Sequence, residues 1–177
     1  MGKTPPKAEA LIREIEVAFS DVPYPGDDDI AIMTCDPSTA EHSVSNLKGK
    51  RWQDWKDKPL ELIGPGKYHG SLAWLSPRAY VYYLPLFMIA CVTHWQGVDI
   101  AGDELIWSLG PPTGEIQSQS EREQAIKFKE EKWRGLSLPQ IRSVISFLQF
   151  IEEEHAESGL HGYIVAAIET MSALAKI

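Results

Sequence analysis

The strongest feature of the hydrophobic pattern is the stretch of residues 75–92, where apolar side chains occupy nearly every position. Leu84, Phe87 and Cys91 follow the spacing of one helix face, and other apolar residues fall on the remaining faces. A helix that is apolar all round is normally buried among other helices. The pattern therefore predicts a buried central helix over about residues 77–95.

Ser76 and Pro77 mark the beginning of this helix, because serine caps helices well and proline suits the first helical position. The uninterrupted apolar run is shorter than the roughly 20 residues that a bilayer core requires. Arg78 and His94 also bracket the run. We therefore interpret the stretch as a core helix and not as a membrane span.

Helical periodicity recurs in segments near both ends of the chain. Their apolar stripes consist of Leu11, Ile12, Ile15, Ala18 and Phe19; of Ile141, Val144, Ile145, Leu148 and Ile151; and of Ile164, Ile168, Met171 and Leu174. No convincing pair of strands and no internal repeat accompanies them. We predict an all-α fold, with residues 1–177 forming one compact multi-helix domain packed around the central helix.

Two tryptophans, Trp52 and Trp55, lie three residues apart and therefore share one face of a short predicted helix. Beside Lys48, Lys50 and Arg51 they suggest a stacking platform for nucleic acid or sugar, or else a pair of core anchors. The chain carries a net charge of −8, which repels nucleic acid. The sequence favours core anchors.

Composition narrows the choice of partner. Hydrophobic residues make up 44% of the chain and charged residues 24%, as in ordinary globular proteins. The net charge of −8 argues against nucleic acid or an anionic membrane as the main partner and permits a basic protein. Two cysteines, Cys35 and Cys91, are too few for a disulfide framework, and residues 1–6 lack the apolar run of a secretory signal. We expect a cytoplasmic protein; its oligomeric state is not predicted.

The sequence contains no catalytic or metal-binding signature. The histidines lack the spacing of zinc ligands, and neither cysteine has a neighbouring partner. We predict no metal and no cofactor. One alternative remains open, a small enzyme whose pocket forms where His69 and Trp74 meet Tyr82 and Tyr83 of the central helix.

Two short acidic runs stand out from the rest of the surface. The first consists of Asp27, Asp28 and Asp29, and the second of Glu152, Glu153 and Glu154. Calcium loops place their ligands at alternate positions, so the first run does not have the spacing of a metal site. Each run is either solvated surface or part of a site for a basic partner, and we predict partner binding at both.

The block Leu75-Ser76-Pro77-Arg78-Ala79-Tyr80-Val81-Tyr82-Tyr83-Leu84-Pro85 resembles a motif of an uncharacterised family of bacterial helical proteins. Its members share Leu-Ser/Thr-Pro, an aromatic residue and Tyr-Tyr-Leu-Pro, with a tryptophan some twenty residues earlier that Trp52 or Trp55 matches. Leu138-Pro139-Gln140 resembles the late helix of that family. The resemblance covers about residues 15–155 and implies a bacterial cytosolic helical protein. It supplies no activity, because the family is a domain of unknown function.

These observations lead to a functional hypothesis. We expect a non-enzymatic, acidic helical protein that binds a basic protein, as an immunity-type inhibitor of a toxin would. The reasons are the absence of catalytic spacing, the net charge of −8 and the two acidic runs. Pairing of apolar helix faces in a homo-oligomer is a further alternative.

Overall fold

The structure is a computed structural model that describes residues 5–32, 41, 44–66, 72–112 and 118–176. Within these ranges the fold is all-α, as predicted, and its β structure is a single antiparallel bridge between Ala31 and Leu75. The α-helices are α1 (Pro6–Phe19), α3 (Trp52–Trp55), α4 (Leu60–Ile63), α5 (Pro77–His94), α6 (Ile100–Leu109), α7 (Gln119–Trp133), α8 (Leu138–Glu154) and α9 (His161–Leu174). Short 3₁₀ helices occupy Leu72–Trp74, Trp95–Gly97 and Ala156–Ser158.

Helix α5 is the predicted central helix and begins where the sequence indicated. The Ser76 hydroxyl accepts a hydrogen bond from the Ala79 N–H at 3.1 Å, and Pro77 occupies the first turn. Every residue from Ala79 to Cys91 is buried. The apolar pattern on all faces of α5 thus corresponds to burial on all faces.

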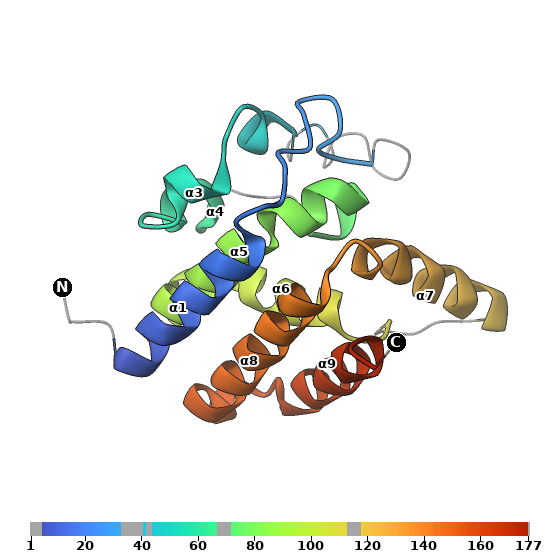
Figure 1. Cartoon of the computed structure of the whole chain (residues 1–177). Helices are drawn as coiled ribbons and strands as arrows, with labels where there is room; N and C mark the ends of the chain where they lie inside the picture. Colours follow the sequence, from blue (N-terminus) through green and yellow to red (C-terminus); the bar gives the residue numbers. More distant parts are fainter. Residues whose placement is uncertain (1–4, 33–40, 42–43, 67–71, 113–117, 177) are drawn as a thin grey trace.

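Most of the other helices pack around α5, and α9 packs against α6 and α8 (Figure 1). Helix α1 contacts both α5 and α8. Helices α3, α6 and α7 also contact α5. In the described part of the chain, no helix combines the length and apolar character that a membrane span needs.

The amphipathic stripes face this interior. On α8, Ile141, Val144 and Leu148 are buried, and on α9 Ile164 and Met171 are buried. Helix α8 begins at a capping box, in which the Ser137 N–H donates to Gln140 Oε1 at 2.8 Å. The periodicity and the capping signal therefore identified the same helix.

Trp52 and Trp55 differ in their burial. Trp52 is buried at 1% exposure and serves as the predicted core anchor. Trp55 is only half-buried, and the ammonium groups of Lys50 and Lys58 lie 5.4 and 4.8 Å from its ring centroid. The prediction of two core anchors is confirmed for Trp52 and only in part for Trp55.

Candidate functional site

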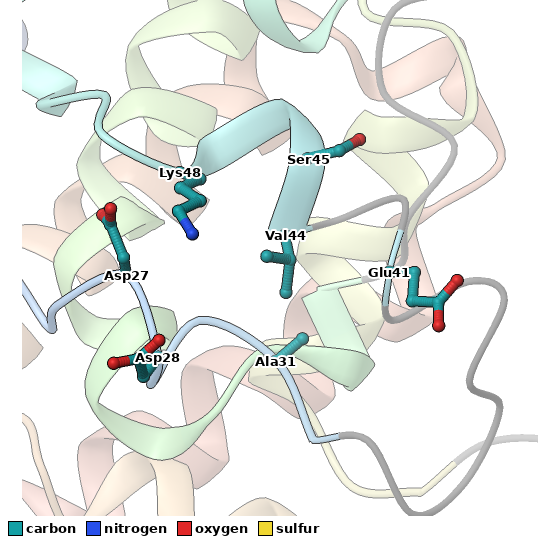
Figure 2. A pocket seen from close by; sticks show the side chains of 7 residues that line it. All are labelled: Asp27, Asp28, Ala31, Glu41, Val44, Ser45 and Lys48. Atoms are coloured by element: carbon teal, nitrogen blue, oxygen red, sulfur yellow. The ribbon is translucent and has the colours of Figure 1, made fainter.

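The clearest candidate site is a hollow of about 420 Å³ between two segments that are distant in the sequence. One wall is the loop that carries Asp27, Asp28 and Ala31. The other wall contains the helical residues 44–47 and the residues next to them. Its lining consists of Asp27, Asp28, Ala31, Glu41, Val44, Ser45 and Lys48 (Figure 2). We refer to this site as the acidic hollow, because its carboxylates outnumber its single ammonium group.

Hydrogen bonds among Tyr24, Asp27 and Gly49 join the two walls. The Tyr24 hydroxyl donates to Asp27 Oδ1 at 2.6 Å. The Gly49 N–H lies 2.8 Å from the Tyr24 oxygen and 3.1 Å from Asp27 Oδ1. Gly49 has φ 69°, a left-handed conformation that glycine adopts without a Cβ penalty. The chain can therefore turn sharply after the helical wall and aim its N–H at the aspartate.

These bonds favour the ionised form of Asp27. The pKa of Asp27 is lowered mainly by the hydrogen bond from Tyr24, with smaller contributions from the Gly49 N–H and the charge of Lys48. Desolvation raises the pKa and opposes part of this effect. Asp27 thus carries a negative charge while it supports the local fold.

Helix α5 fixes the helical wall through the motif tyrosines. The Tyr83 hydroxyl lies 2.8 Å from the Leu47 carbonyl and 2.9 Å from the Lys50 carbonyl, on either side of the turn. Burial raises the pKa of Tyr83, so its hydroxyl remains a proton donor at neutral pH. The Tyr82 ring packs edge-on against Tyr24 at a centroid distance of 5.4 Å. The buried core therefore holds both walls.

The start of α5 fixes the other end of the aspartate loop. The Ser76 hydroxyl donates to the Asp29 carbonyl at 2.8 Å, and the Ser76 N–H donates to the Ile30 carbonyl at 3.0 Å. Arg78 Nη1 lies 3.3 Å from Asp29 Oδ2. Asp29 is thus engaged with α5 and does not line the acidic hollow.

Of the first acidic run, Asp28 is the member whose carboxylate is free to meet a ligand. Asp28 is exposed, and within the described residues its side chain forms no hydrogen bond or ion pair. Glu41 has the same character on the opposite side of the hollow. The run therefore combines structural acids with one available acid.

The second acidic run has a different environment at the end of α8. Glu152 is bonded to the imidazole of His161, and Glu153 forms an ion pair with Lys7 of α1. Glu154 is exposed. Two of the three glutamates thus interact with basic groups of the same chain, and binding of a partner there remains a prediction.

The pocket predicted around the central tyrosines also remains a prediction. His69 lies outside the described residues. Trp74 is half-buried in the 3₁₀ helix before α5, and its carbonyl accepts from the Ile32 N–H at 2.7 Å. Tyr82 and Tyr83 are buried, and their hydroxyls bond to Gln53 and to backbone carbonyls. Both tyrosines thus help to hold the walls of the acidic hollow in place.

Sequence reasoning missed the residues of the helical wall. Val44 and Glu41 drew no attention, and Lys48 was noted only as part of a basic cluster. Their place in the hollow depends on packing against a loop some twenty residues earlier. The sequence signals that bear on that packing are Gly49, which permits the turn, and the tyrosines of α5.

The described residues contain no cluster of three or more His, Cys, Asp or Glu side chains suited to a metal ion. The chemistry available in the acidic hollow is therefore that of charge and hydrogen bonding. Its three carboxylates and one ammonium give the lining an excess of negative charge. Such a lining attracts a cationic group.

Comparison with known proteins identifies a family for this chain. No curated protein matches the chain, and no solved structure matches it either. The model of a family of unknown function, DUF6714, matches residues 7–171, which is nearly the whole chain. The match includes both walls of the acidic hollow and all of α5. The chain therefore belongs to the family of unknown function DUF6714.

Proposed function

We propose that this protein binds a basic segment of another protein and that the acidic hollow receives a cationic side chain. The observation that carries the proposal is the pair of available carboxylates, Asp28 and Glu41, on the two sides of a space of about 420 Å³. A space of this size accommodates a long side chain with its neighbouring backbone. The net charge of −8 adds long-range attraction for a basic partner.

The hydrogen bonds from α5 and its cap to the two walls support binding by a preformed surface. Ordering a loop during binding lowers affinity, whereas a site held in place beforehand avoids that cost. Tyr83 and Ser76 anchor the two walls to buried positions of the core. A basic side chain would therefore meet Asp28 on a loop whose backbone is already in position.

The finer form of the proposal is an immunity-type inhibitor of a toxin in the bacterial cytoplasm. The support is indirect: the sequence lacks catalytic spacing, its two cysteines suit a reducing compartment, and its acidic charge is complementary to a basic protein. Isolation of a stoichiometric basic partner from the native cytosol, with loss of the partner's toxicity on binding, is the outcome that this form predicts.

The test of basic-segment binding uses an amidated hexalysine peptide as the probe, followed by fluorescence anisotropy at low and high salt. The double variant Asp28→Asn/Glu41→Gln should bind about tenfold more weakly and with a smaller salt dependence. The matched control is Glu169→Gln/Glu123→Gln, which removes two exposed carboxylates from α9 and α7. Equal affinity in the double variant and the control would contradict the proposal.

A further inference from the structure

Helix α7 packs on the rest of the protein differently from the long helix that follows it. Its buried residues are Lys132 and Trp133, both in the last turn. Helix α8, by contrast, has buried residues from Gln140 to Ile151. Figure 1 shows α7 at the edge of the molecule with its N-terminal end outermost. Most of α7 is therefore held in place with little burial of its own side chains.

A lysine attaches the middle of α7 to the end of α6. The Lys129 ammonium donates hydrogen bonds to the carbonyls of Gly110 at 2.8 Å and Pro111 at 3.1 Å, and it also bonds to the Trp107 carbonyl. The end of α6 has such carbonyls available, because the last turn of a helix leaves them without partners inside the helix. Burial lowers the pKa of Lys129 to about 8, so lost hydration of the ammonium offsets part of what these bonds contribute. The contact is specific in geometry and modest in strength.

The last turn of α7 is held more firmly. Trp133 Nε1 donates to a carbonyl of α6 at 3.1 Å, and the buried Lys132 ammonium donates to the Leu72 carbonyl at 3.0 Å. Just after the helix, Gly135 passes so close to α5 that a Cβ there would lie 2.9 Å from Val81 Cγ2. Helix α7 is thus fixed at its C-terminal end, and the Lys129 contact lies one turn before that end.

We infer that residues 119–129 of α7 open as a unit while the last turn stays fixed, and that the Lys129 contact holds this unit closed. Opening returns the ammonium to water and uncovers the carbonyls at the end of α6, together with the half-buried Ile126 and Phe128. Segments with few buried apolar contacts open at a lower free energy than the whole molecule. The opening controls access to a surface that the acidic hollow does not include, and the inference does not depend on the proposed function.

The released segment does not keep its helix. Helices shorter than about 12–15 residues are marginal in water unless they pack against other elements. The capping box of Ser118 and Glu121 supports the first turn but supplies no packing. Opening therefore exposes the backbone amides of this segment to solvent, where hydrogen exchange detects them.

Hydrogen exchange of the full-length protein, followed by mass spectrometry, tests the inference. In the wild type we expect amides of residues 122–129 to exchange at least about a hundredfold faster than those of residues 141–151 in α8, after correction for intrinsic rates. Lys129→Ala should accelerate exchange in residues 122–129 by about a further fivefold, the factor for one net hydrogen bond, and leave α8 unchanged. Lys127→Ala, which removes an exposed lysine of the same helix, is the control and should change neither segment.

Three results would overturn the inference. Equal protection of the two segments in the wild type would mean that α7 opens only with the whole protein. Unchanged exchange in Lys129→Ala would mean that Lys129 does not hold the segment closed. Equal acceleration of both segments in Lys129→Ala would mean that α7 is an integral part of the core. Each of these results leaves the binding of hexalysine to the acidic hollow as a separate question.

Discussion

The core around α5 and the acidic hollow share the same helix but are stabilised by different forces. From Ala79 to Cys91 the helix is buried on every face, largely by apolar side chains. The walls of the hollow are positioned by a few hydrogen bonds, chiefly from Tyr24, Ser76 and Tyr83. Apolar burial is spread over many contacts, whereas each of these hydrogen bonds can be removed by substitution of one side chain.

The difference shows how the acidic hollow is built on the core. The side chains that line the acidic hollow lie on short segments, and most of them are exposed or half-buried. Their position comes from α5, which reaches them with the hydroxyls of Ser76 and Tyr83. We therefore expect substitutions in the core to destabilise the whole protein. Substitutions that remove the hydrogen bonds of Ser76 or Tyr83 should increase mobility mainly in the walls of the hollow.

The largest effect is expected for Phe87→Ala in the core. Phe87 is 1% exposed, so its truncation leaves a cavity and should lower the free energy of unfolding by about 3–5 kcal/mol. Urea denaturation measures this loss. Val17→Ala is the control, because Val17 is 76% exposed and should change little. A loss below about 1 kcal/mol for Phe87→Ala would contradict the central position of α5.

A smaller effect is expected for Tyr83→Phe, which removes the hydroxyl that reaches the carbonyls of Leu47 and Lys50. Loss of one such bond should lower the free energy of unfolding by about 1 kcal/mol. Hydrogen exchange of the Gly49 amide should accelerate more than exchange within α5. Tyr163→Phe is the control, since Tyr163 is 41% exposed. Unchanged exchange at Gly49 would mean that Tyr83 does not fix the helical wall.

Acid should weaken the hydrogen bonds that Asp27 accepts from Tyr24 and Gly49. The pKa of Asp27 is lower in the folded protein, mainly because of the Tyr24 hydroxyl, than the ordinary value of about 3.9. The unfolded chain therefore binds the proton first, and the stabilisation is present above pH 4 and is lost as the pH falls through the folded pKa. The difference in melting temperature between wild type and Asp27→Asn should shrink below pH 4. A constant difference down to pH 2 would contradict this assignment.

The smallest effect on stability is expected for replacement of Glu152, Glu153 and Glu154 by glutamine. The substitution removes carboxylates from the C-terminal end of α8, where they oppose the helix dipole by a few tenths of a kcal/mol each. It also removes the pairs with His161 and Lys7, and exposed pairs of this kind contribute about 0–1 kcal/mol. The two effects oppose one another, so the free energy of unfolding should change by less than about 0.5 kcal/mol.

The same triple variant tests partner binding at the second acidic run. If these glutamates face a basic protein, association with hexalysine at low salt should slow and become less sensitive to salt. An association rate equal to that of wild type would make the end of α8 ordinary surface. The comparison with Asp28→Asn then shows which acidic run attracts the ligand.

The sequence predicted the core far better than it predicted the hollow, for a physical reason. Burial of α8 and α9 on one face produces a periodic apolar pattern in the sequence, and burial of α5 on every face produces a nearly continuous apolar run. Ser76 with Pro77 and Ser137 with Gln140 add local capping signals. The existence of all three helices and the beginning of α5 and α8 were therefore predictable.

The acidic hollow has no comparable pattern in the sequence. The three aspartates are identical letters in a row, yet Asp27 is bonded to Tyr24, Asp29 pairs with Arg78, and Asp28 is available. Which acid is available depends on Tyr24 nearby and on Arg78, which lies far along the chain. The helical wall with Lys48 likewise joins the hollow only through tertiary packing.

Mapping the contact surface of amidated hexalysine on the wild-type protein tests whether the acidic hollow binds a basic segment. Backbone amide chemical shifts are followed by NMR while the peptide is added at low salt. We expect the largest chemical-shift changes at residues 26–31 and 44–49, which form the two walls of the acidic hollow. Changes confined to the end of α8 and the start of α9, with residues 26–31 and 44–49 unaffected, would contradict it.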